Sequence, residues 1–161
     1  MKLGIFGGSF NPVHRGHVGL VERAIAELSL DLVLVVPAAC NPFKAGEPGF
    51  LDDRTRLELV RKAFAGNPKV QVDDREIQKG GISYAIDTVR EVKAEHPDAE
   101  LFFIVGEDSV EGLPRWKNYR ELAELCRFVS YPRTRESSTE IRRRLKSGES
   151  VADMMPDNLK E

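Results

Sequence analysis

The sequence predicts an α/β fold: a Rossmann-like, doubly wound parallel sheet with helices on both faces and a helical segment at the C-terminal end. Short apolar runs of strand length alternate along the chain with longer segments of helical period, the order typical of βαβ units. The chain has 161 residues, of which 41% are hydrophobic. That length is enough for a single domain, residues 1–161, with a substantial core.

Five apolar runs are expected to form the strands. The first is closed by Gly7 and Gly8, and the second is rich in β-branched residues and stops at Pro37. The expected strands are residues 2–6, 32–36, 70–72, 101–105 and 127–131.

The helices are predicted from apolar periodicity and from capping patterns. Between the first two strands, one buried face is formed by apolar positions at helical spacing, namely Leu20, Val21, Ala24, Ile25 and Leu28. Further helices are expected at residues 53–64 and 84–95. The capping-box pattern SSTE at residues 137–140 should open a last helix that ends near Gly148, and the final dozen residues are expected to be weakly structured.

Charge and composition exclude several classes of protein. Twenty-four Lys and Arg residues stand against 26 Asp and Glu residues, a net charge of -2 that disfavours non-specific nucleic-acid binding. No apolar run approaches the roughly 20 residues of a membrane helix, and residues 1–8 lack the apolar stretch of a signal peptide. We therefore expect a soluble, cytoplasmic protein, with Cys40 and Cys126 reduced and used in packing, because they form no C-x-x-C pair.

Two of the three histidines, His14 and His17, lie in the run GGSFNPVHRGH at residues 7–17, after the first strand. Glycines at a strand end let backbone N–H groups approach an anion, and a helix N-terminus adds positive charge, so this loop is expected to bind phosphate. The run fits neither the dinucleotide-binding glycine pattern nor the P-loop. Two alternatives are metal ligation, for which the loop offers no Cys or carboxylate, and a capping or packing role.

The run resembles the G-G-[ST]-F-[ND]-P-x-H-x-G-H signature of the nucleotidylyltransferase superfamily. In that superfamily the two histidines contact the phosphates of ATP or CTP. The form GSFNPVH is most similar to the nicotinate-nucleotide adenylyltransferases. The resemblance extends over nearly the whole chain.

Further matches follow in the order expected of that family. After the second strand, the segment PAACNPFK at residues 37–44 resembles P-x-x-x-x-P-x-K, whose lysine, here Lys44, helps to hold reacting phosphates. It lies in a loop, residues 38–52, long enough to suggest a function. At the next helix, RLEL resembles R-x-x-M, with Leu59 in place of Met and Arg56 as a weak site candidate.

Two features concern the pyridine mononucleotide, the SYAIDT segment and the later tryptophan. SYAIDT at residues 83–88 resembles S-Y-T-x-D-T, with Ala85 in place of Thr. After the fourth strand, GED resembles G-x-D, and the only tryptophan, Trp116, follows in a charged segment. In the family this Trp stacks on the nicotinate ring, whereas the alternative is an ordinary core tryptophan.

The last match is SSTEIR at residues 137–142, which resembles [IV]-S-S-T-x-[IV]-R, a helix N-terminus that binds the triphosphate of ATP. The alternative is a solvated basic face formed by Arg142, Arg143 and Arg144, and it can apply to two of these three.

The resemblance implies two sets of binding residues. Those expected at ATP are Gly7, Gly8, Ser9, Phe10, Gly16, His17, Gly106, Asp108, Ser137, Ser138, Thr139 and Arg142. Those expected at the mononucleotide are Asn11, Lys44, Ser83, Tyr84, Ala85 and Trp116.

The implied reaction transfers AMP from ATP to nicotinate mononucleotide, giving deamido-NAD and pyrophosphate without a covalent intermediate. A phosphate monoester with a second pKa near ~6 is already mostly dianionic, so no general base is needed. Catalysis then rests on positioning and positive charge, supplied by His14, His17, Lys44 and Arg142, with Mg²⁺ arriving on ATP and no dedicated metal site. The binding partners that the resemblance implies are ATP and a pyridine mononucleotide, and a homo-oligomer is compatible with the sequence.

One difference between this sequence and the family pattern keeps alternative functions open. Relatives of this family usually carry a few tens more residues where residues 132–136 join the fifth strand to SSTEIR. A nucleotide-binding module without turnover is one alternative; nicotinamide mononucleotide or pantetheine phosphate as acceptor is another. Nicotinate is favoured because backbone N–H donors, which Ala85 retains, can bind a carboxylate, and pantetheine enzymes typically read GSFDP.

Overall fold

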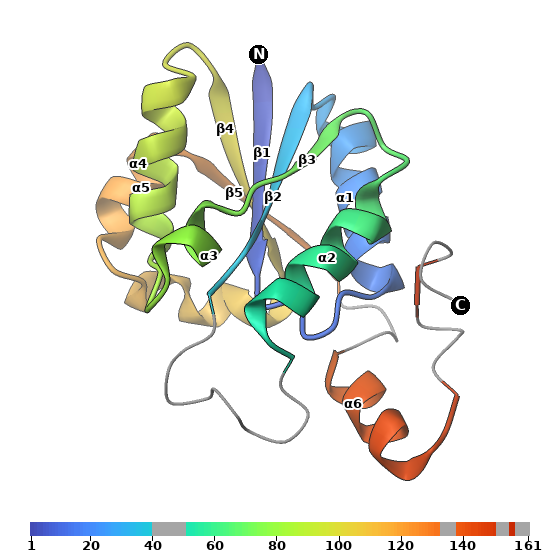
Figure 1. Cartoon of the computed structure of the whole chain (residues 1–161). Coiled ribbons are helices and arrows are strands. Elements are labelled where there is room, and N and C mark those ends of the chain that lie inside the picture. Colours follow the sequence, from blue (N-terminus) through green and yellow to red (C-terminus); the bar gives the residue numbers. More distant parts are fainter. Residues whose placement is uncertain (40–50, 133–137, 151–154, 157–161) are drawn as a thin grey trace.

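The computed structural model describes residues 1–39, 51–132, 138–150 and 155–156. Its centre is a parallel sheet of five strands in the order β3-β2-β1-β4-β5 (Figure 1). The strands are β1 Lys2–Gly8, β2 Leu32–Pro37, β3 Val70–Val72, β4 Glu100–Gly106 and β5 Arg127–Tyr131. All the predicted strands are confirmed, within two residues at each end.

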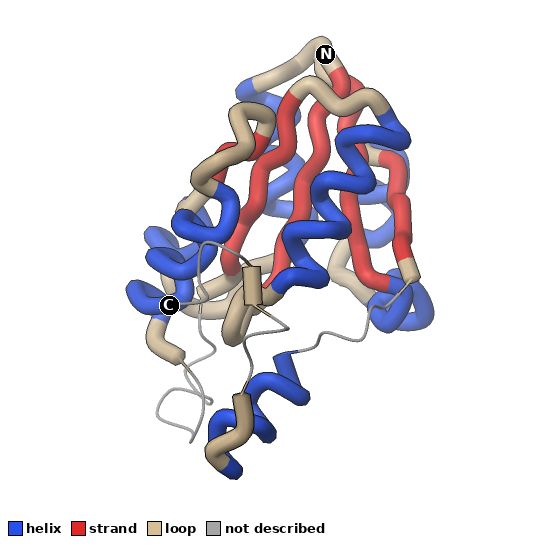
Figure 2. The backbone as a smooth tube through the Cα atoms, turned by 90° about the vertical axis from the view of Figure 1, so that its right-hand side faces the viewer, coloured by secondary structure: helices blue, strands red, loops and turns tan. Residues whose placement is uncertain are grey.

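Helices cover both faces of the sheet (Figure 2). Helices α1 (Arg15–Leu28) and α2 (Asp53–Phe64) pack on one face, and α4 (Ala85–Glu95) and α5 (Tyr119–Leu125) pack on the other. The last helix, α6 (Ser138–Ser147), ends beside Gly148 as expected. The Rossmann-like, doubly wound fold is therefore confirmed.

Three short elements have no counterpart among the predicted ones: helix α3 (Arg75–Lys79), the 3-10 helix η1 (Glu107–Arg115) and helix α5. The longest of them has nine residues, and α3 buries none of its own. Periodicity over so few residues cannot be separated from a loop. Most of the final dozen residues, expected to be weakly structured, lie outside the described ones.

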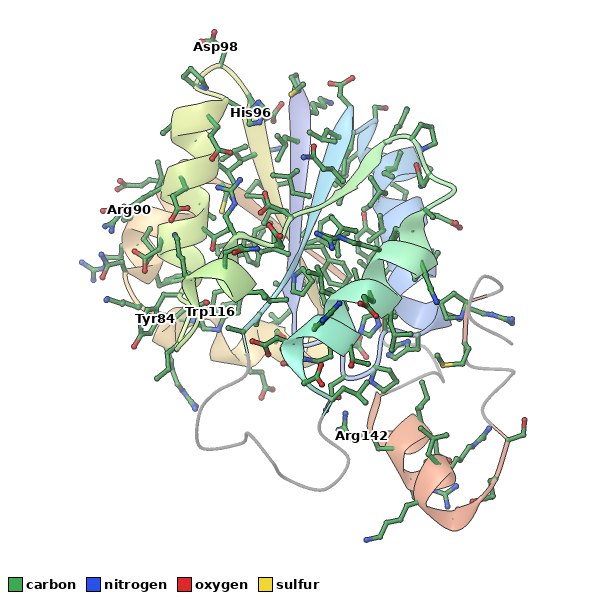
Figure 3. The ribbon with its side chains drawn as sticks, in the orientation of Figure 1. Tyr84, Arg90, His96, Asp98, Trp116 and Arg142 are labelled. Carbon is green, nitrogen blue, oxygen red and sulfur yellow. The ribbon has the colours of Figure 1, made fainter. Side chains whose placement is uncertain are left out.

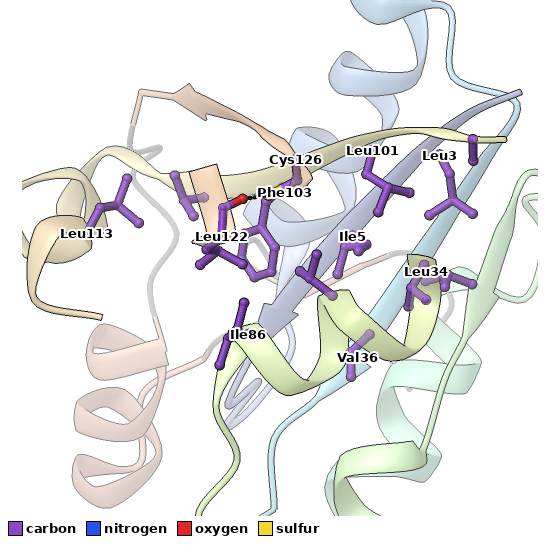
Figure 4. Close-up of a cluster of buried hydrophobic side chains, with 14 residues drawn as sticks. Leu3, Ile5, Leu34, Val36, Ile86, Leu101, Phe103, Leu113, Leu122 and Cys126 are labelled. Carbon is purple, nitrogen blue, oxygen red and sulfur yellow. Dashed lines mark hydrogen bonds between the residues drawn. The ribbon is translucent and has the colours of Figure 1, made fainter. Parts of the chain in front are cut away.

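Each face of the sheet has its own apolar core. Alternate residues of a strand point to opposite faces, so Phe103 packs toward α4 and α5 while Phe102 packs toward α1 and α2. Figure 4 shows the first core, in which the thiol of Cys126 donates to the Leu122 carbonyl oxygen at 3.3 Å. Cys126 is a free cysteine buried in this core, which confirms its packing role, and burial raises its pKa to about 12. Cys40 lies outside the described residues. No helix in the described ranges has the length and hydropathy needed to span a membrane.

The chain order creates one switch point in the sheet. From β1 the chain runs outward through β2 to β3, then returns to β4 on the other side of β1. Connections leaving β1 and β4 therefore diverge onto opposite faces of the sheet. In open α/β sheets, the crevice at the carboxyl ends of such strands is where ligands bind.

Gly4 in β1 is packed so closely that any side chain there would displace its neighbours. A Cβ there would lie 2.9 Å from Leu30 Cδ1 and 3.1 Å from Ile104 Cδ1, inside the buried core. We expect Gly4→Ala to lower the free energy of unfolding by about 1–3 kcal/mol through overpacking. The matched control is Gly19→Ala in α1, where nothing lies within 4 Å and where alanine should add about 0.5–1 kcal/mol. Urea denaturation of the two variants measures both effects; equal midpoints would contradict the packing account.

Candidate active site

The loop that follows β1, residues 9–14, is buried from Phe10 onward, and only Ser9 is exposed. Phe10 and Asn11 are each 3% exposed. The Phe10 ring meets the Phe6 ring edge-on at 5.4 Å between centroids and the His17 ring at 4.9 Å. These contacts fix the loop, here called the β1–α1 loop, against the end of the strand.

The two histidines form a reciprocal cap on α1. His14 is the N-cap residue, and its Nδ1 accepts a hydrogen bond from the Gly16 N–H at 3.1 Å. The Nδ1 of His17 accepts from the His14 N–H at 3.0 Å. The rings stack with centroids 3.7 Å apart. Because Nδ1 accepts in both rings, a neutral ring carries its proton on Nε2. The capping role considered as an alternative is thus present. With Nδ1 accepting in the cap, the hydrogen-bond donor of each ring is Nε2–H.

His17 is neutral at neutral pH. Burial, and secondly the charge of His14, hold the pKa of His17 well below its usual value of 6.5. The lowered pKa favours a neutral ring that offers an N–H donor, and a positive charge on His17 beside bound phosphates stays a prediction.

This lowered pKa predicts how stability depends on pH. An unfolded chain protonates His17 near pH 6.5, whereas the folded chain resists protonation until a lower pH. The stabilisation is therefore complete above about pH 6.5 and is lost as the pH falls below it. Between pH 7 and 5 we expect the thermal midpoint of the wild type to fall further than that of His17→Asn. Parallel pH dependences in the two proteins would show that His17 is not the group responsible.

Arg56 in α2 ties the β1–α1 loop to the chain that enters α2. Its side chain is 1% exposed. Its guanidinium donates to the Ser9 carbonyl oxygen at 2.6 Å, to the Leu51 carbonyl oxygen at 3.2 Å and to Asp53 Oδ1 at 2.5 Å. Asn11 strengthens the same junction, since its Oδ1 accepts from the Leu51 N–H at 2.8 Å. Arg56, the weak site candidate, therefore lies under the loop as a structural tie.

Arg142 of α6 reaches the same loop. Its guanidinium donates to the Asn11 carbonyl oxygen, and Figure 3 shows it near the carboxyl-end edge of the sheet. Arg143 and Arg144 instead donate to Glu140, at 2.6 and 3.1 Å. The basic helix face considered as an alternative thus accounts for two of the three arginines, and Arg142 is the one directed to the candidate site.

A pocket of about 490 Å³ opens beside the loop, across the ends of β1 and β4. Its lining includes the half-buried Trp116. The Trp116 ring packs edge-on against the rings of Phe103 and Phe128, with centroids 5.6 and 6.2 Å away. We call it the Trp116 pocket. Figure 3 places Trp116 and Tyr84 together at this edge, while the third histidine, His96, lies at the opposite end of the molecule.

The Trp116 pocket brings together residues predicted from three separate motifs. The predicted residues in its lining are Gly7, Gly8, Ser83, Tyr84, Ala85, Gly106 and Trp116. Ser9, Phe10, Asn11, His14, Gly16, His17 and Arg142 lie around the β1–α1 loop. Predicted residues outside the description are Lys44 and Ser137, together with the side chains of Asp108, Ser138 and Thr139.

Several lining residues were missed by the sequence analysis, notably Glu76, Ser109, Arg115 and Lys117. Arg115 and Lys117 flank Trp116 in the sequence, so the charged segment itself was the available signal. The ammonium of Lys117 lies 4.4 Å from the centroid of the Tyr84 ring, a cation–π contact across the pocket wall.

The first turn of α4 begins at the wall of the Trp116 pocket. Its N-cap residue, Tyr84, makes no side-chain cap hydrogen bond. An N-terminus of this kind carries partial positive charge and N–H donors suited to an anion. The lining also holds two cationic side chains, Lys117 and Arg115, against one carboxylate, that of Glu76, so the pocket favours a negatively charged group.

The sheet has one switch point, the loop at its edge is capped by histidines, and the neighbouring pocket is lined by an aromatic ring. These features define an α/β nucleotide-binding protein. The family model described as cytidylyltransferase-like matches residues 5–148. The chain belongs to this cytidylyltransferase-like family.

Known relatives agree with this assignment. A protein of Geobacter sp. strain M21, named "Probable nicotinate-nucleotide adenylyltransferase", is 47% identical over 88% of this chain and 65% of its own length. One of Gemmatimonas aurantiaca with the same name is 37% identical over 98% of this chain and 87% of its own. A crystal structure from Vibrio parahaemolyticus, provisionally named a nicotinate-nucleotide adenylyltransferase, superimposes with a TM-score of 0.79 at 25% identity, covering 97% of this chain and 88% of that one.

The lengths of the relatives can be compared with the predicted shortening of this chain at residues 132–136. This chain spans only 65% of the Geobacter relative. The alignment with the Gemmatimonas relative runs over 185 residues, more than the 161 of this chain, so that relative carries extra residues inside the aligned region. The junction where the shortfall is expected, residues 132–136, lies almost wholly outside the described residues.

Proposed function

We propose that this chain transfers AMP from ATP to nicotinate mononucleotide, releasing pyrophosphate and forming deamido-NAD. The observation that carries the proposal is the adjacency of two unlike subsites at one sheet edge. The β1–α1 loop offers N–H donors for phosphates, and the Trp116 pocket offers an aromatic face beside a positively polarised helix start. Phe6 joins them, because it lines the pocket and its ring lies 6.1 Å from that of His17.

In the proposed mechanism the protein positions two anions and stabilises the charge transferred between them. The phosphate of the mononucleotide attacks the α-phosphorus of ATP, the bond to the pyrophosphate oxygen breaks, and pyrophosphate leaves. The attacking oxygen needs no base, because the dianion predominates above its pKa of ~6. His14 and His17 donate Nε2–H to phosphate oxygens, and Arg142 contributes a fixed positive charge beside them. Lys44 would add a second one.

Mg²⁺ is expected to enter with ATP. The donors proposed for the phosphates, the ring N–H groups of His14 and His17 and the guanidinium of Arg142, are nitrogen groups, whereas Mg²⁺ prefers oxygen ligands. Within the described residues no group of three or more His, Cys, Asp or Glu could hold a metal ion. Bound to the triphosphate, the ion would neutralise part of its charge. Because ATP is an intracellular metabolite, we place the enzyme in the cytoplasm.

Nicotinate is preferred to nicotinamide in this proposal because of the charge of the pocket wall. The start of α4 at Ala85, together with Lys117 and Arg115, presents donors and positive charge. A carboxylate gains from both, while a neutral amide gains only from the donors.

A side-by-side assay tests the proposal. Pyrophosphate release is measured with Mg²⁺-ATP and, in turn, nicotinate mononucleotide, nicotinamide mononucleotide and pantetheine phosphate. The expected result is a kcat/KM at least about tenfold higher for nicotinate mononucleotide than for the amide, equivalent to 1.4 kcal/mol. A strong preference for the amide or for pantetheine phosphate would replace the assigned substrate. ATP binding without product from any acceptor would indicate a module without turnover.

Trp116 provides a test of the mononucleotide subsite. Stacking of a ring on an aromatic side chain is worth about 1–3 kcal/mol, so Trp116→Ala should raise the KM for the mononucleotide by roughly tenfold or more and leave the KM for ATP nearly unchanged. Trp116→Phe keeps the packing on Phe103 and should lose less. Trp116 is the only tryptophan, so its fluorescence reports binding in the wild type directly. Equal losses for both substrates would contradict the assignment.

A further inference from the structure

The Trp116 pocket contains a carboxylate that the proposed mechanism does not use. Glu76 lies on α3 and lines the pocket, and it also borders a neighbouring hollow of about 280 Å³. Its side chain is half-buried. A carboxylate in a pocket that is otherwise suited to an anion requires an explanation.

The hydrogen bonding of Glu76 provides one. The Thr88 hydroxyl donates to its Oε2 at 2.6 Å, and Ser83 lines the same two cavities as Glu76. Ser83 precedes α4 and Thr88 lies in its first turn. Glu76 therefore ties the first turn of α4 to α3, and Tyr84 and Ala85, which line the pocket, lie just before the tied residue.

The tie compensates for a weak local start to α4. A helix start is normally fixed by a capping side chain, and Tyr84 makes no such bond. Burial raises the pKa of Glu76, while the hydrogen bond from Thr88 favours its charged form. A direct contact between this carboxylate and the carboxylate of the mononucleotide would be repulsive. The geometry therefore favours an indirect role.

We propose that Glu76 is a positioning residue for the mononucleotide: it fixes the first turn of α4, and with it the first N–H groups of that helix, in the orientation that receives the substrate's anionic ring substituent. The inference rests on the proposed function of the Trp116 pocket. It assigns to Glu76 an effect on mononucleotide binding and none on ATP binding, because its bond with Thr88 lies on the α4 side of the pocket.

The test compares Glu76→Ala with Glu76→Gln, which keeps an oxygen acceptor for the Thr88 hydroxyl. Hydrogen bonds to a charged group are typically strong enough that their loss changes affinity by roughly tenfold or more. We expect Glu76→Ala to raise the KM for nicotinate mononucleotide by about that factor, with kcat and the KM for ATP within about twofold. Glu76→Gln should recover most of the loss. Glu124→Ala, an exposed carboxylate of α5, is the matched control and should change nothing.

Three results would overturn the inference: an unchanged KM for the mononucleotide in Glu76→Ala, an equal rise in both KM values, or a Glu76→Gln variant as impaired as Glu76→Ala. If Glu76→Ala does not fold, Thr88→Val removes the bond at nearly constant shape and should raise the same KM. The Kd from Trp116 fluorescence separates this inference from the proposed function. If the wild type binds nicotinate mononucleotide but does not turn it over, the proposed function is wrong, and the ratio of the Kd of Glu76→Ala to that of the wild type still tests the role of Glu76. If the wild type does not bind the mononucleotide, both proposals are wrong.

Discussion

Replacing His17 with asparagine is expected to lower kcat by about a hundredfold or more while the protein stays folded. The Nδ1 of His17 caps α1 by accepting from the His14 N–H at 3.0 Å. The side-chain oxygen of asparagine can accept the same bond, but the variant has no counterpart of Nε2–H. Loss of a preorganised donor of this kind costs about 3–4 kcal/mol of transition-state stabilisation.

The comparison with His17→Ala separates the two roles of the ring. Alanine removes the cap as well as the donor, so it should lose a similar amount of kcat and about 1 kcal/mol of stability in addition. His96→Asn, at the opposite end of the molecule (Figure 3), is the control and should leave kcat unchanged. Pre-steady-state and steady-state turnover with saturating substrates measure the effect. A His17→Asn variant with near wild-type kcat would remove His17 from the catalytic residues.

Arg56→Met is expected to have the largest effect on stability, about 3 kcal/mol. The guanidinium is 1% exposed and donates to the carbonyl oxygens of Ser9 and Leu51. Methionine fills much of the space but leaves both oxygens without these bonds, and hydrogen bonds to charged groups are worth about 1.5–3 kcal/mol each. Asp53 also loses its partner, although at 34% exposure it regains solvent contact.

Arg54→Met in the same helix is the matched control. Arg54 is 90% exposed and pairs with Glu58 at 3.4 Å, a surface ion pair expected to contribute less than about 0.5 kcal/mol. Chemical denaturation should therefore separate the two variants by at least about 2 kcal/mol. Because Arg56 holds Ser9 in place, the folded fraction of Arg56→Met should also bind ATP more weakly. Equal stabilities of the two variants would contradict the structural tie.

The fold was predictable because its signals are local. Each strand is a contiguous apolar run, and the periodic helices α1, α2 and α4 present whole faces to the core. The candidate site was predictable to the extent that its residues belong to contiguous motifs, such as the run from Gly7 to His17. Trp116 was found for the same reason, since its position after β4 could be read from the sequence.

The parts that escaped prediction depend on contacts between distant segments. Arg56 donates to Ser9, 47 residues earlier in the chain, and no pattern around Arg56 indicates that acceptor. Glu76 lies on a helix of five residues without periodicity, and its role follows only from its bond with Thr88, 12 residues later in the chain. The lowered pKa of His17 arises from burial and from the charge of the neighbouring His14, and a sequence shows neither.

The position of β4 beside β1 has a consequence for how this protein is made. Residue Lys2 pairs with Glu100, and Phe6 pairs with Ile104, so the two strands that frame the Trp116 pocket are joined only after about a hundred residues have been synthesised. Contacts of such high sequence separation form late and slowly. A nascent chain that ends before β4 would carry the histidine-capped loop but no pocket, so substrate could not assist the folding of the N-terminal half, and ligand-dependent stabilisation would begin only when the central strand pair closes.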